Sequence, residues 1–193
     1  MHHIYHTEGI ILGSKNYGEA GKYYAIFTRD LGMINASAQG IRKISSKLRF
    51  VLQDFSYVKI DLVRGKDFWR ITSASKTNKL ESVLKNSFNI TIFANITRLL
   101  KRLLAGEYPN PILFADLLNG FHFLEKSKSE NESENIEMVI VLRILNNLGY
   151  IGNNDVLKNI TKSPYEDGLI FEANKSRSKI LSEINKAIHE THL

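Results

Sequence analysis

The sequence predicts an α+β protein in which an N-terminal five-stranded β-barrel of the OB type precedes an α-helical bundle. Short strand-like segments separated by turns fill residues 6–79, and no long helical pattern interrupts them. Near Asn78 the spacing of the apolar residues changes from two to about 3.6, the period of an α-helix. We therefore expect a barrel domain over residues 1–79 and a helical domain over residues 80–193.

Five segments of the first part either alternate between apolar and polar residues or are rich in β-branched and aromatic ones. They cover residues 6–12, 23–29, 33–39, 55–63 and 68–75. A turn-rich loop over residues 14–22 follows the first strand, a short loop with Gly32 makes a hairpin of the next two, and a turn at residues 64–67 joins the last two. Closing five short strands into an OB-type barrel removes the sheet edges at this size.

Helical spacing of apolar residues marks a helix over residues 88–104, with Gly106 just past its end. Asn110 and Pro111 suit the cap and the first position of a second helix. The stretch 126–135 contains no apolar residue, so we expect an exposed connection there.

Residues 136–148 are apolar almost all round, as in the buried central helix of a bundle. Residues 151–175 have the least regular pattern, and residues 168–171 resemble a short strand. Ser176 or Ser178 is expected to cap a final helix. The apolar side of that helix consists of Ile180, Leu181, Ile184 and Ile188.

Positive charge is concentrated in the predicted barrel. Residues 1–80 contain 13 Lys and Arg against 6 Asp and Glu, a net charge of +7, whereas residues 81–193 contain 13 against 14, a net charge of −1. Such asymmetry indicates a basic binding module joined to a charge-balanced one. A polyanion is therefore the expected ligand of the first part.

Composition argues against several other classes of protein. No uninterrupted apolar stretch approaches the roughly 18 residues of a membrane span, and the first residues lack the pattern of a secretory signal. The chain has no cysteine, which excludes disulfides and thiolate metal sites and suits a reducing cytosol. We expect a cytoplasmic protein without membrane contact.

The basic stretch at residues 31–53 contains four cationic side chains and no carboxylate. Because nearby acids would neutralise a basic patch, such a stretch keeps a positive field. It is either a cradle for a polyanion or a solvated basic loop on an ordinary barrel. The four cations are Arg42, Lys43, Lys47 and Arg49.

Familiar catalytic patterns are missing from the sequence. It has neither a phosphate-binding loop with a Gly-Lys-Ser/Thr ending nor a Gly-x-Ser-x-Gly elbow. His2, His3 and His6 lie near the terminus, without the helical spacing of a metal-binding pair. We expect a binding protein rather than an enzyme, with no cofactor and no metal.

Several segments together resemble the RecO family of recombination mediators, over about residues 5–150. In the barrel part they are Thr7 to Leu12, Tyr17-Gly18-Glu19, Phe27-Thr28 with Gly32, Ala38 with Gly40 and Arg42-Lys43, Leu52-Gln53 with Phe55-Ser56, and Arg64-Gly65. In the helical part they are Pro109-Asn110-Pro111 with Leu113-Phe114, and Arg143 to Tyr150. Their order and spacing carry the resemblance, since no single segment is specific.

The resemblance implies an OB barrel joined to a helical domain in a nucleoid-associated DNA repair protein. It also implies binding of single- and double-stranded DNA, annealing of complementary strands, and help in loading a RecA-type recombinase. The implied protein partners are RecR and the acidic C-terminal tail of single-strand-binding protein (SSB). Many family members hold zinc with four cysteines after the segment that matches Leu148-Gly149-Tyr150, but this chain has none, so we predict no zinc.

The candidate site residues follow from charge and aromatic content. Cations of the barrel are the expected contacts for the DNA backbone: Lys22, Arg42, Lys43, Lys47, Arg49, Arg64, Lys66 and Arg70. Four aromatic residues are expected either to stack on bases or to belong to the core: Tyr17, Tyr57, Phe68 and Trp69.

A second set of cations lies on the first helix, two of them on one face and the third beside them. It is either a binding site for the acidic SSB tail or a solvated helix face. The set consists of Arg98, Lys101 and Arg102. Two alternatives to a DNA mediator therefore stay open, namely a protein-interaction adaptor and an RNA-binding OB protein, because phosphate contacts and stacking serve both nucleic acids.

Overall fold

A computed structural model describes residues 3–77, 80, 83–152 and 155–191. The chain forms two compact units, and each unit consists of two separate segments of the sequence. The first unit comprises Met1–Glu81 with Thr97–Phe114, and the second comprises Ser82–Ile96 with Ala115–Leu193. The boundary between the units therefore falls within two helices rather than at a single linker.

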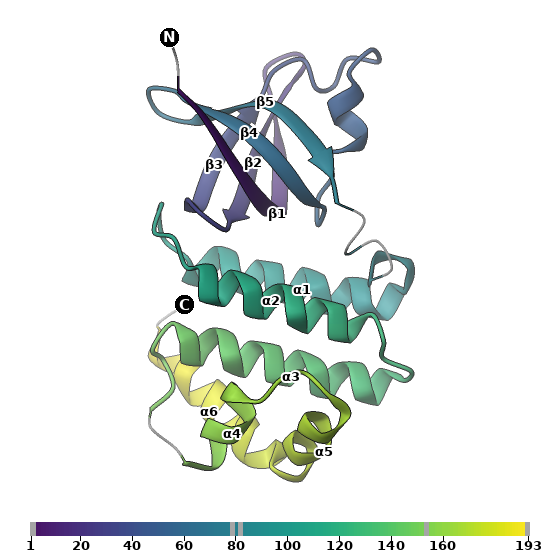
Figure 1. Cartoon of the computed structure of the whole chain (residues 1–193), viewed down its shortest axis with the longest axis vertical. Coiled ribbons are helices and arrows are strands. Elements are labelled where there is room, and N and C mark those ends of the chain that lie inside the picture. Colours follow the sequence, from purple (N-terminus) through teal and green to yellow (C-terminus); the bar gives the residue numbers. More distant parts are fainter. Residues whose placement is uncertain (1–2, 78–79, 81–82, 153–154, 192–193) are drawn as a thin grey trace. The chain divides into compact units, whose positions relative to one another are not determined.

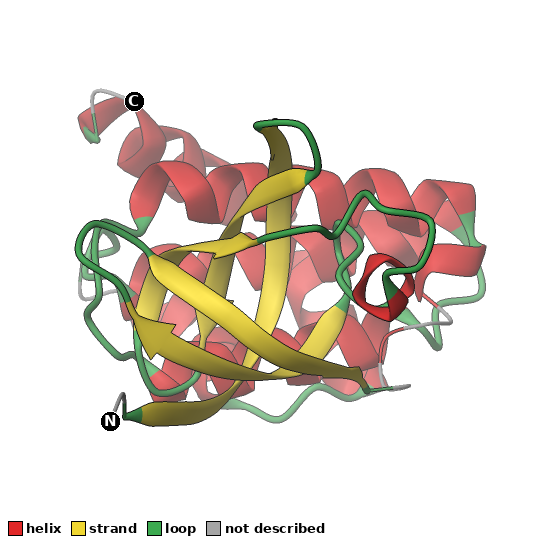
Figure 2. Ribbon diagram, turned by 90° about the horizontal axis from the view of Figure 1, so that it is seen from above, coloured by secondary structure: helices red, strands yellow, loops and turns green. Residues whose placement is uncertain are grey.

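The first unit contains a closed five-stranded barrel, as the sequence predicts (Figures 1 and 2). Its strands are β1 (Ile4–Tyr17), β2 (Gly21–Thr28), β3 (Gly32–Ala38), β4 (Tyr57–Arg64) and β5 (Trp69–Lys76). Around the barrel they follow the order β1-β2-β3-β5-β4, and only the β3–β5 pair, among the described strands, is parallel. The prediction of an OB-type barrel is confirmed.

Alternate residues of each strand fill the barrel core. On β2 the inward side chains include Tyr24 and Ile26, and on β4 they include Ile60 and Leu62. The Tyr24 hydroxyl donates a hydrogen bond of 3.2 Å to the Leu52 carbonyl, and burial raises the pKa of this phenol to about 12. The residues between them point away from the core and form the outer face of the barrel.

Strand β1 is longer than expected. Instead of ending at residue 12, it continues through Ser14–Tyr17, which pairs with the start of β2 after a shift of register between Ile11 and Gly13. Gly18, with a φ of +54°, lies in the tight turn that follows. The extension has little apolar content because its side chains face solvent, so apolar alternation alone did not mark it.

Six α-helices follow among the described residues, and the first two match their predicted positions. They are α1 (Ser87–Leu103) and α2 (Pro111–Leu124). The Asn110 side chain accepts a hydrogen bond of 3.0 Å from the Leu113 amide, as expected of a helix cap. A short 3-10 helix, η3 (Val83–Lys85), precedes α1.

The prediction of an exposed connection over residues 126–135 is wrong in its second half. Helix α3 (Glu130–Asn147) begins within it, and Ser133 and Asn135 are buried. A capping box starts the helix: Ser129 accepts from the Glu132 amide, and the Glu132 carboxylate accepts from the Lys128 amide. The polar residues thus form a helix start instead of a loop.

The prediction of a strand at residues 168–171 is also wrong. These residues belong to α5 (Asp167–Lys175), which follows α4 (Asp155–Lys162). Leu169, Ile170 and Ala173 are buried at helical spacing, so a short amphipathic helix explains the same apolar residues.

The last helix, α6 (Arg177–Glu190), begins directly after Ser176. The Ser176 side chain makes no capping hydrogen bond, and Leu181 is exposed although it was expected on the apolar side. Helix α3 contacts α4, α5 and α6, and its residues from Ile136 onward are mostly buried, which confirms the central buried helix (Figure 1).

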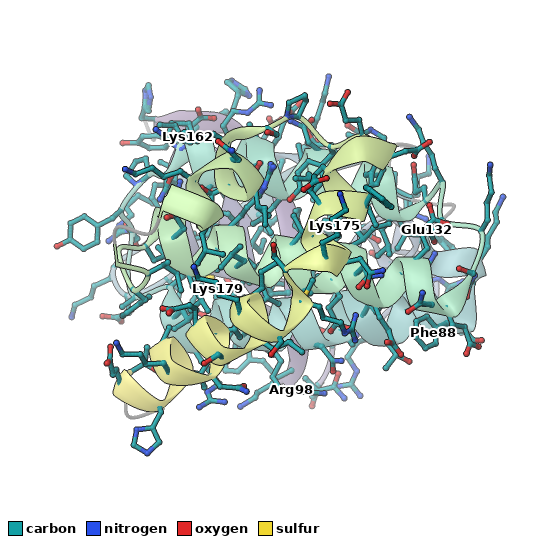
Figure 3. All side chains as sticks on the ribbon, turned by 90° about the horizontal axis from the view of Figure 1, so that it is seen from below. Phe88, Arg98, Glu132, Lys162, Lys175 and Lys179 are labelled. Atoms are coloured by element: carbon teal, nitrogen blue, oxygen red, sulfur yellow. The ribbon has the colours of Figure 1, made fainter. Side chains whose placement is uncertain are left out.

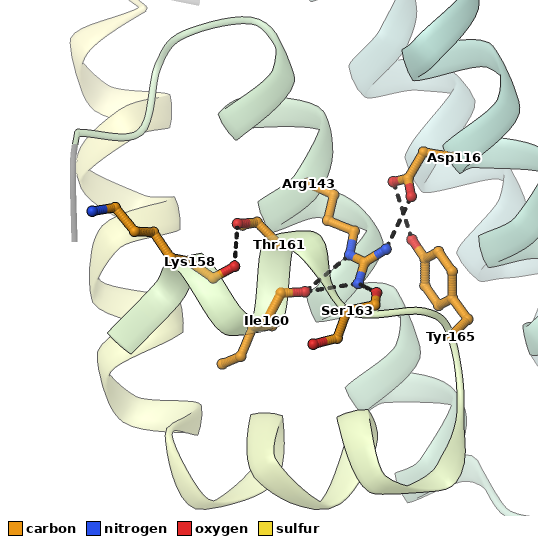
Figure 4. A network of polar contacts seen from close by, with 7 residues as sticks. All are labelled: Asp116, Arg143, Lys158, Ile160, Thr161, Ser163 and Tyr165. Atoms are coloured by element: carbon orange, nitrogen blue, oxygen red, sulfur yellow. Dashed lines mark hydrogen bonds and ion pairs between the residues drawn. The ribbon is translucent and has the colours of Figure 1, made fainter. Parts of the chain in front are cut away.

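A buried arginine links the helices of the second unit (Figure 4). Arg143 of α3 donates hydrogen bonds to the carbonyl oxygens of Ile160 and Ser163 and to the Asp116 carboxylate. Burial raises the pKa of Asp116, and its ion pair with Arg143 opposes that shift. Among the described residues, no helix is long and apolar enough to cross a membrane.

Candidate nucleic-acid interface

The connection between β3 and β4, residues 39–56, contains the predicted cationic side chains and is called the basic loop below. Arg42, Lys43 and Lys47 are exposed on it, and Lys47 begins the 3-10 helix η1 (Lys47–Phe50). The Arg42 amide donates to the Ala20 carbonyl at 2.9 Å, and its guanidinium donates to the Gly18 carbonyl at 3.3 Å. These bonds hold the basic loop against the turn between β1 and β2.

The charges of the basic loop are not neutralised from within the described parts of the chain. There, no ion pair joins a carboxylate to Arg42, Lys43, Lys47 or Arg49. Two apolar side chains, Ile44 and Phe50, are exposed among these cations, and the Arg49 guanidinium lies 4.4 Å from the Phe50 ring centre. The loop thus offers positive charge together with apolar contact surface.

The strand register places three further cations on the barrel. Lys15 pairs with Tyr23, Tyr23 with Ser37, and Ser37 with Arg70, which makes one row across β1, β2, β3 and β5. Residues directly opposite in a ladder share a face of the sheet. Lys22 precedes Tyr23 on β2 and pairs with the buried Ala38, so its side chain lies on the other face of the strand, where its ammonium donates to the Ser14 hydroxyl at 3.4 Å.

Arg64, one of the predicted DNA contacts, is occupied by an internal partner. Its guanidinium pairs with the Glu107 carboxylate at 2.5 Å and lies 4.8 Å from the centre of the Trp69 ring. The Trp69 indole N–H donates to the same carboxylate at 3.0 Å. Arg64 is therefore less available to a phosphate than Lys66, which is exposed in the adjoining turn.

The four predicted aromatic residues divide between core and surface. Tyr57 and Trp69 are buried, and the Tyr57 hydroxyl donates to Glu8 at 2.5 Å, so both belong to the barrel structure. Burial and this bond raise the pKa of Tyr57. Tyr17 and Phe68 are exposed, with exposed fractions of 52% and 45%.

Tyr23, which the sequence reasoning missed, joins the two exposed rings into one stripe. Its ring centre lies 4.4 Å from that of Tyr17 and 4.9 Å from that of Phe68. Burial and a hydrogen bond with Tyr17 raise the pKa of the Tyr23 phenol. The stripe runs from the β1–β2 turn over β2 to the β4–β5 turn, where OB folds bind oligonucleotides.

A cleft of about 560 Å³ lies beside this stripe, on the outer face of β1–β3. Its lining includes Tyr23, Phe68 and Asn35, and also Lys101 from the end of α1. The Lys101 ammonium is 3.2 Å from the point where a β-carbon on Gly13 would stand. Lys101 therefore belongs to the barrel surface, although the sequence grouped it with Arg98 and Arg102.

Arg98 and Arg102 are exposed on α1 (Figure 3, Arg98 labelled). Neither is among the described residues that line the cleft. Of the three cations predicted as one site for an acidic tail, the cleft is thus lined by Lys101.

Two family models match the chain. The N-terminal model of recombination protein O matches residues 1–79, and the C-terminal model of the same family matches residues 84–153. Together they cover most of the chain.

Similar curated proteins carry the name "DNA repair protein RecO". The protein from Heliobacterium modesticaldum is 28% identical over 147 residues, 76% of this chain and 52% of the relative. That from Thermodesulfovibrio yellowstonii is 30% identical over 148 residues, 76% of this chain and 58% of the relative. That from Rubrobacter xylanophilus is 31% identical over 125 residues, 65% of this chain and 50% of the relative.

The chain spans about half the length of these relatives. It contains no cysteine, so the thiolate ligands of a four-cysteine zinc site are absent from its sequence. The barrel, the helical unit and the two matched models agree on one assignment, and the chain belongs to the RecO family.

Proposed function

We propose that this chain is a recombination mediator in DNA repair. It binds single- and double-stranded DNA, anneals complementary strands and helps to load a RecA-type recombinase onto DNA coated with SSB. The observation that carries the proposal is the exposed basic loop, whose cations have no ion-pair partner in the described residues and lie beside an OB-type aromatic stripe. Family membership and the names of the relatives support the choice of DNA.

The mechanism requires only electrostatics and stacking. Each phosphate neutralised by Lys or Arg releases counterions, which favours binding at low salt. Two strands held on one positive surface repel each other less than they do in free solution, so they meet and pair more often. Exposed rings such as Tyr17 and Phe68 add sequence-independent stacking. No nucleotide hydrolysis or bond chemistry is needed.

Protein partners belong to the same proposal. Arg98 and Arg102 are exposed cations that suit the acidic tail of SSB, and RecR is the second partner that the family suggests. In this arrangement the barrel holds DNA while helix α1 contacts the protein that covers it. A titration of the SSB tail peptide against the Arg98→Glu, Arg102→Glu variant tests this part, and unchanged affinity would remove it.

The deciding experiment uses two triple charge reversals. In the test variant Arg42, Lys43 and Lys47 of the basic loop become Glu, and in the control variant Lys162, Lys175 and Lys179 of the helical unit become Glu. The control residues extend outward from their helices (Figure 3), and the change in net charge is the same. We measure filter binding of oligonucleotides and annealing of SSB-coated complementary strands without ATP.

The basic-loop variant is expected to lose DNA binding and annealing, while the control retains both. Equal losses in the two variants would show that total charge, not the basic loop, attracts DNA. Single-stranded RNA of the same sequence serves as a further competitor. Tighter binding of RNA than of DNA would favour the alternative of an RNA-binding OB protein.

A further inference from the structure

We infer that the cleft on the outer face of β1–β3 holds one unpaired nucleotide of a DNA strand. The inference deepens the proposed function and depends on it, because it names what the barrel recognises beyond the DNA backbone. The cleft lies wholly within the first unit, between the β2–β3 face, the β4–β5 turn and the end of α1. Its volume of about 560 Å³ is within the range of small-molecule sites.

The strand register explains why a cavity exists here. Gly13 pairs with Ala25, and Ala25 pairs with Asn35, so this row across the outer face begins with two very small residues. The neighbouring row carries the large side chains of Lys15 and Tyr23. The step between a row of small side chains and a row of large ones forms the floor and one wall of the cleft.

The aromatic wall suits a nucleobase. Tyr23 and Phe68 both line the cleft with their ring centres 4.9 Å apart, and Phe68 keeps an exposed fraction of 45%. Stacking on such rings is open to every base because every base has a π-face. A base that is paired inside a duplex has both faces covered, so the wall selects unpaired nucleotides.

The cleft contains charged groups of both signs, which suits a ligand that has both a phosphate and hydrogen-bond donors, as a nucleotide does. Lys15 and Lys101 supply cations for the phosphate. Asp67, Glu107 and Asn35 supply oxygen acceptors, which the amino groups of cytosine, adenine or guanine can satisfy. An acidic peptide would also find the two lysines, but its carboxylates, unlike a base, bring no amino group for the acceptors of the cleft.

The partner of Glu107 strengthens this assignment. Arg64 and the Trp69 indole both donate to the Glu107 carboxylate, which fixes its orientation at the edge of the cleft. Arg64 therefore acts as a positioning residue for the cleft and not as a contact for the DNA backbone. The structure gives separate roles to the basic loop, which attracts DNA of any kind, and to the cleft, which retains an unpaired nucleotide.

Photo-crosslinking tests the position of the base. The probe is a single-stranded oligonucleotide of about 12 nucleotides, within the site sizes of OB folds, with one 5-iodocytosine. After irradiation of the full chain, mass spectrometry should find the crosslink at Tyr23 or Phe68. The Phe171→Ala variant removes an aromatic side chain of the helical unit with an exposed fraction of 61%, and it should leave the yield unchanged.

Two further variants test the cleft without removing the crosslinked rings. Ala25→Leu fills the floor, and Lys101→Gln removes a cation, so each should lower the affinity for single-stranded DNA about tenfold, comparable to the loss of one stacked base. Affinity for duplex DNA should change less than about twofold, because the basic loop is intact. Circular dichroism and the duplex affinity report whether Ala25→Leu is folded. Lys101→Gln changes an exposed side chain, so it tests the cleft independently of any effect of Ala25→Leu on folding.

The outcomes separate the two levels of the proposal. If the protein binds DNA but crosslinks only outside the cleft, or if both variants bind single strands normally, the nucleotide pocket is wrong and the mediator function stands. If the wild-type chain retains neither probe nor duplex, the proposed function itself fails. If an acidic peptide ending in Phe binds the wild-type cleft and loses affinity in Ala25→Leu while the DNA crosslink is absent, the cleft is a peptide site instead.

Discussion

At the scale of single residues, Arg143 is a buried charge in the second unit that depends on its hydrogen-bond partners. Its side chain is only 5% exposed and lies 4.3 Å from the centre of the Tyr165 ring. It donates hydrogen bonds to Asp116 and to two backbone carbonyls near the end of α4 (Figure 4). A buried charge of this kind is tolerated because each of its partners is in place.

Arg143→Met should therefore lower the free energy of unfolding by about 3–5 kcal/mol, since it leaves a half-buried carboxylate and two carbonyls without their donor. Urea denaturation followed by circular dichroism measures the change. The control is Lys175→Met, which removes a surface ion pair of 2.9 Å with Glu172 and should cost about 0–1 kcal/mol.

A second change checks the cause of the loss. Adding Asp116→Asn to Arg143→Met removes the uncompensated carboxylate, so the double variant should recover part of the lost stability. A double variant that is less stable than Arg143→Met alone would contradict this explanation. It would show that Asp116 contributes mainly through contacts other than Arg143.

Glu137 of α3 gives a prediction about pH. Burial raises its pKa above the ordinary value of 4.5, and a hydrogen bond from Asn95 opposes the shift. The folded state then holds the proton more tightly than the unfolded state. This residue's contribution to stability therefore falls as the pH rises from about 4.5 through the folded-state pKa.

In Glu137→Gln that contribution is absent, so the stability of the variant relative to the wild type should increase between pH 4 and pH 7. Urea denaturation at several pH values measures it. Glu190→Gln, at an exposed position on α6, serves as the control and should follow the wild-type pH profile. A constant difference between Glu137→Gln and the wild type would contradict the assigned pKa shift.

At the scale of elements, two turn glycines differ in why they disfavour other residues. One has only a left-handed backbone conformation, and the other also lacks space for a side chain. Gly32 in the β2–β3 hairpin has a φ of +70°, and a β-carbon there would overlap the backbone of Tyr108. Gly18 in the β1–β2 turn has a φ of +54°, and nothing lies within 4 Å of its β-carbon position. Both positions disfavour other residues, but only Gly32 also excludes a side chain.

Gly18→Ala should lower the free energy of unfolding by about 1–2 kcal/mol, the cost of a left-handed non-glycine residue. Gly32→Ala should cost about 3 kcal/mol or more, because the Tyr108 backbone must move as well. Thermal and urea denaturation of the two variants gives the comparison. Equal losses would mean that the loop at Tyr108 yields freely, so that close packing against Gly32 contributes little.

Elements whose apolar pattern is continuous could be predicted from the sequence, and those built from polar residues could not. Helix α1 has an apolar face and the central part of α3 is apolar almost all round, and their positions agree with the prediction. The end of β1 is polar and was missed, because pairing with β2, not burial, defines it. The start of α3 was missed although the Ser129 to Glu132 capping pattern was present in the sequence.

The same distinction applies to the candidate site. The basic loop was predictable because its cations are neighbours in the sequence. The aromatic stripe and the cleft were not, because they depend on strand register: Lys15, Tyr23 and Arg70 share a row only once β1, β2, β3 and β5 are paired. Likewise Arg64 and Glu107 are 43 residues apart, so their ion pair is invisible in the sequence.

At the scale of the whole molecule, charge is distributed unevenly along the chain, and the cations of the basic part differ in whether they are paired within the chain. Of the cations in the barrel part, Arg64 is paired internally, whereas Arg42 has no ion-pair partner among the described residues. Net charge alone therefore overstates the number of groups that can meet a phosphate. The salt dependence of DNA binding counts those groups directly.

We expect the logarithm of the affinity for duplex DNA to fall linearly with the logarithm of salt concentration, with a slope of about 0.9 per phosphate contact. Arg42→Gln should reduce the steepness by about one such contact. Arg64→Gln removes the same formal charge but a cation already neutralised by Glu107, so its slope should remain close to that of the wild type. Fluorescence anisotropy over a series of salt concentrations measures both. If Arg64→Gln flattened the slope as much as Arg42→Gln, Arg64 would have to leave Glu107 when DNA binds, and its positioning role in the cleft would be lost in the complex.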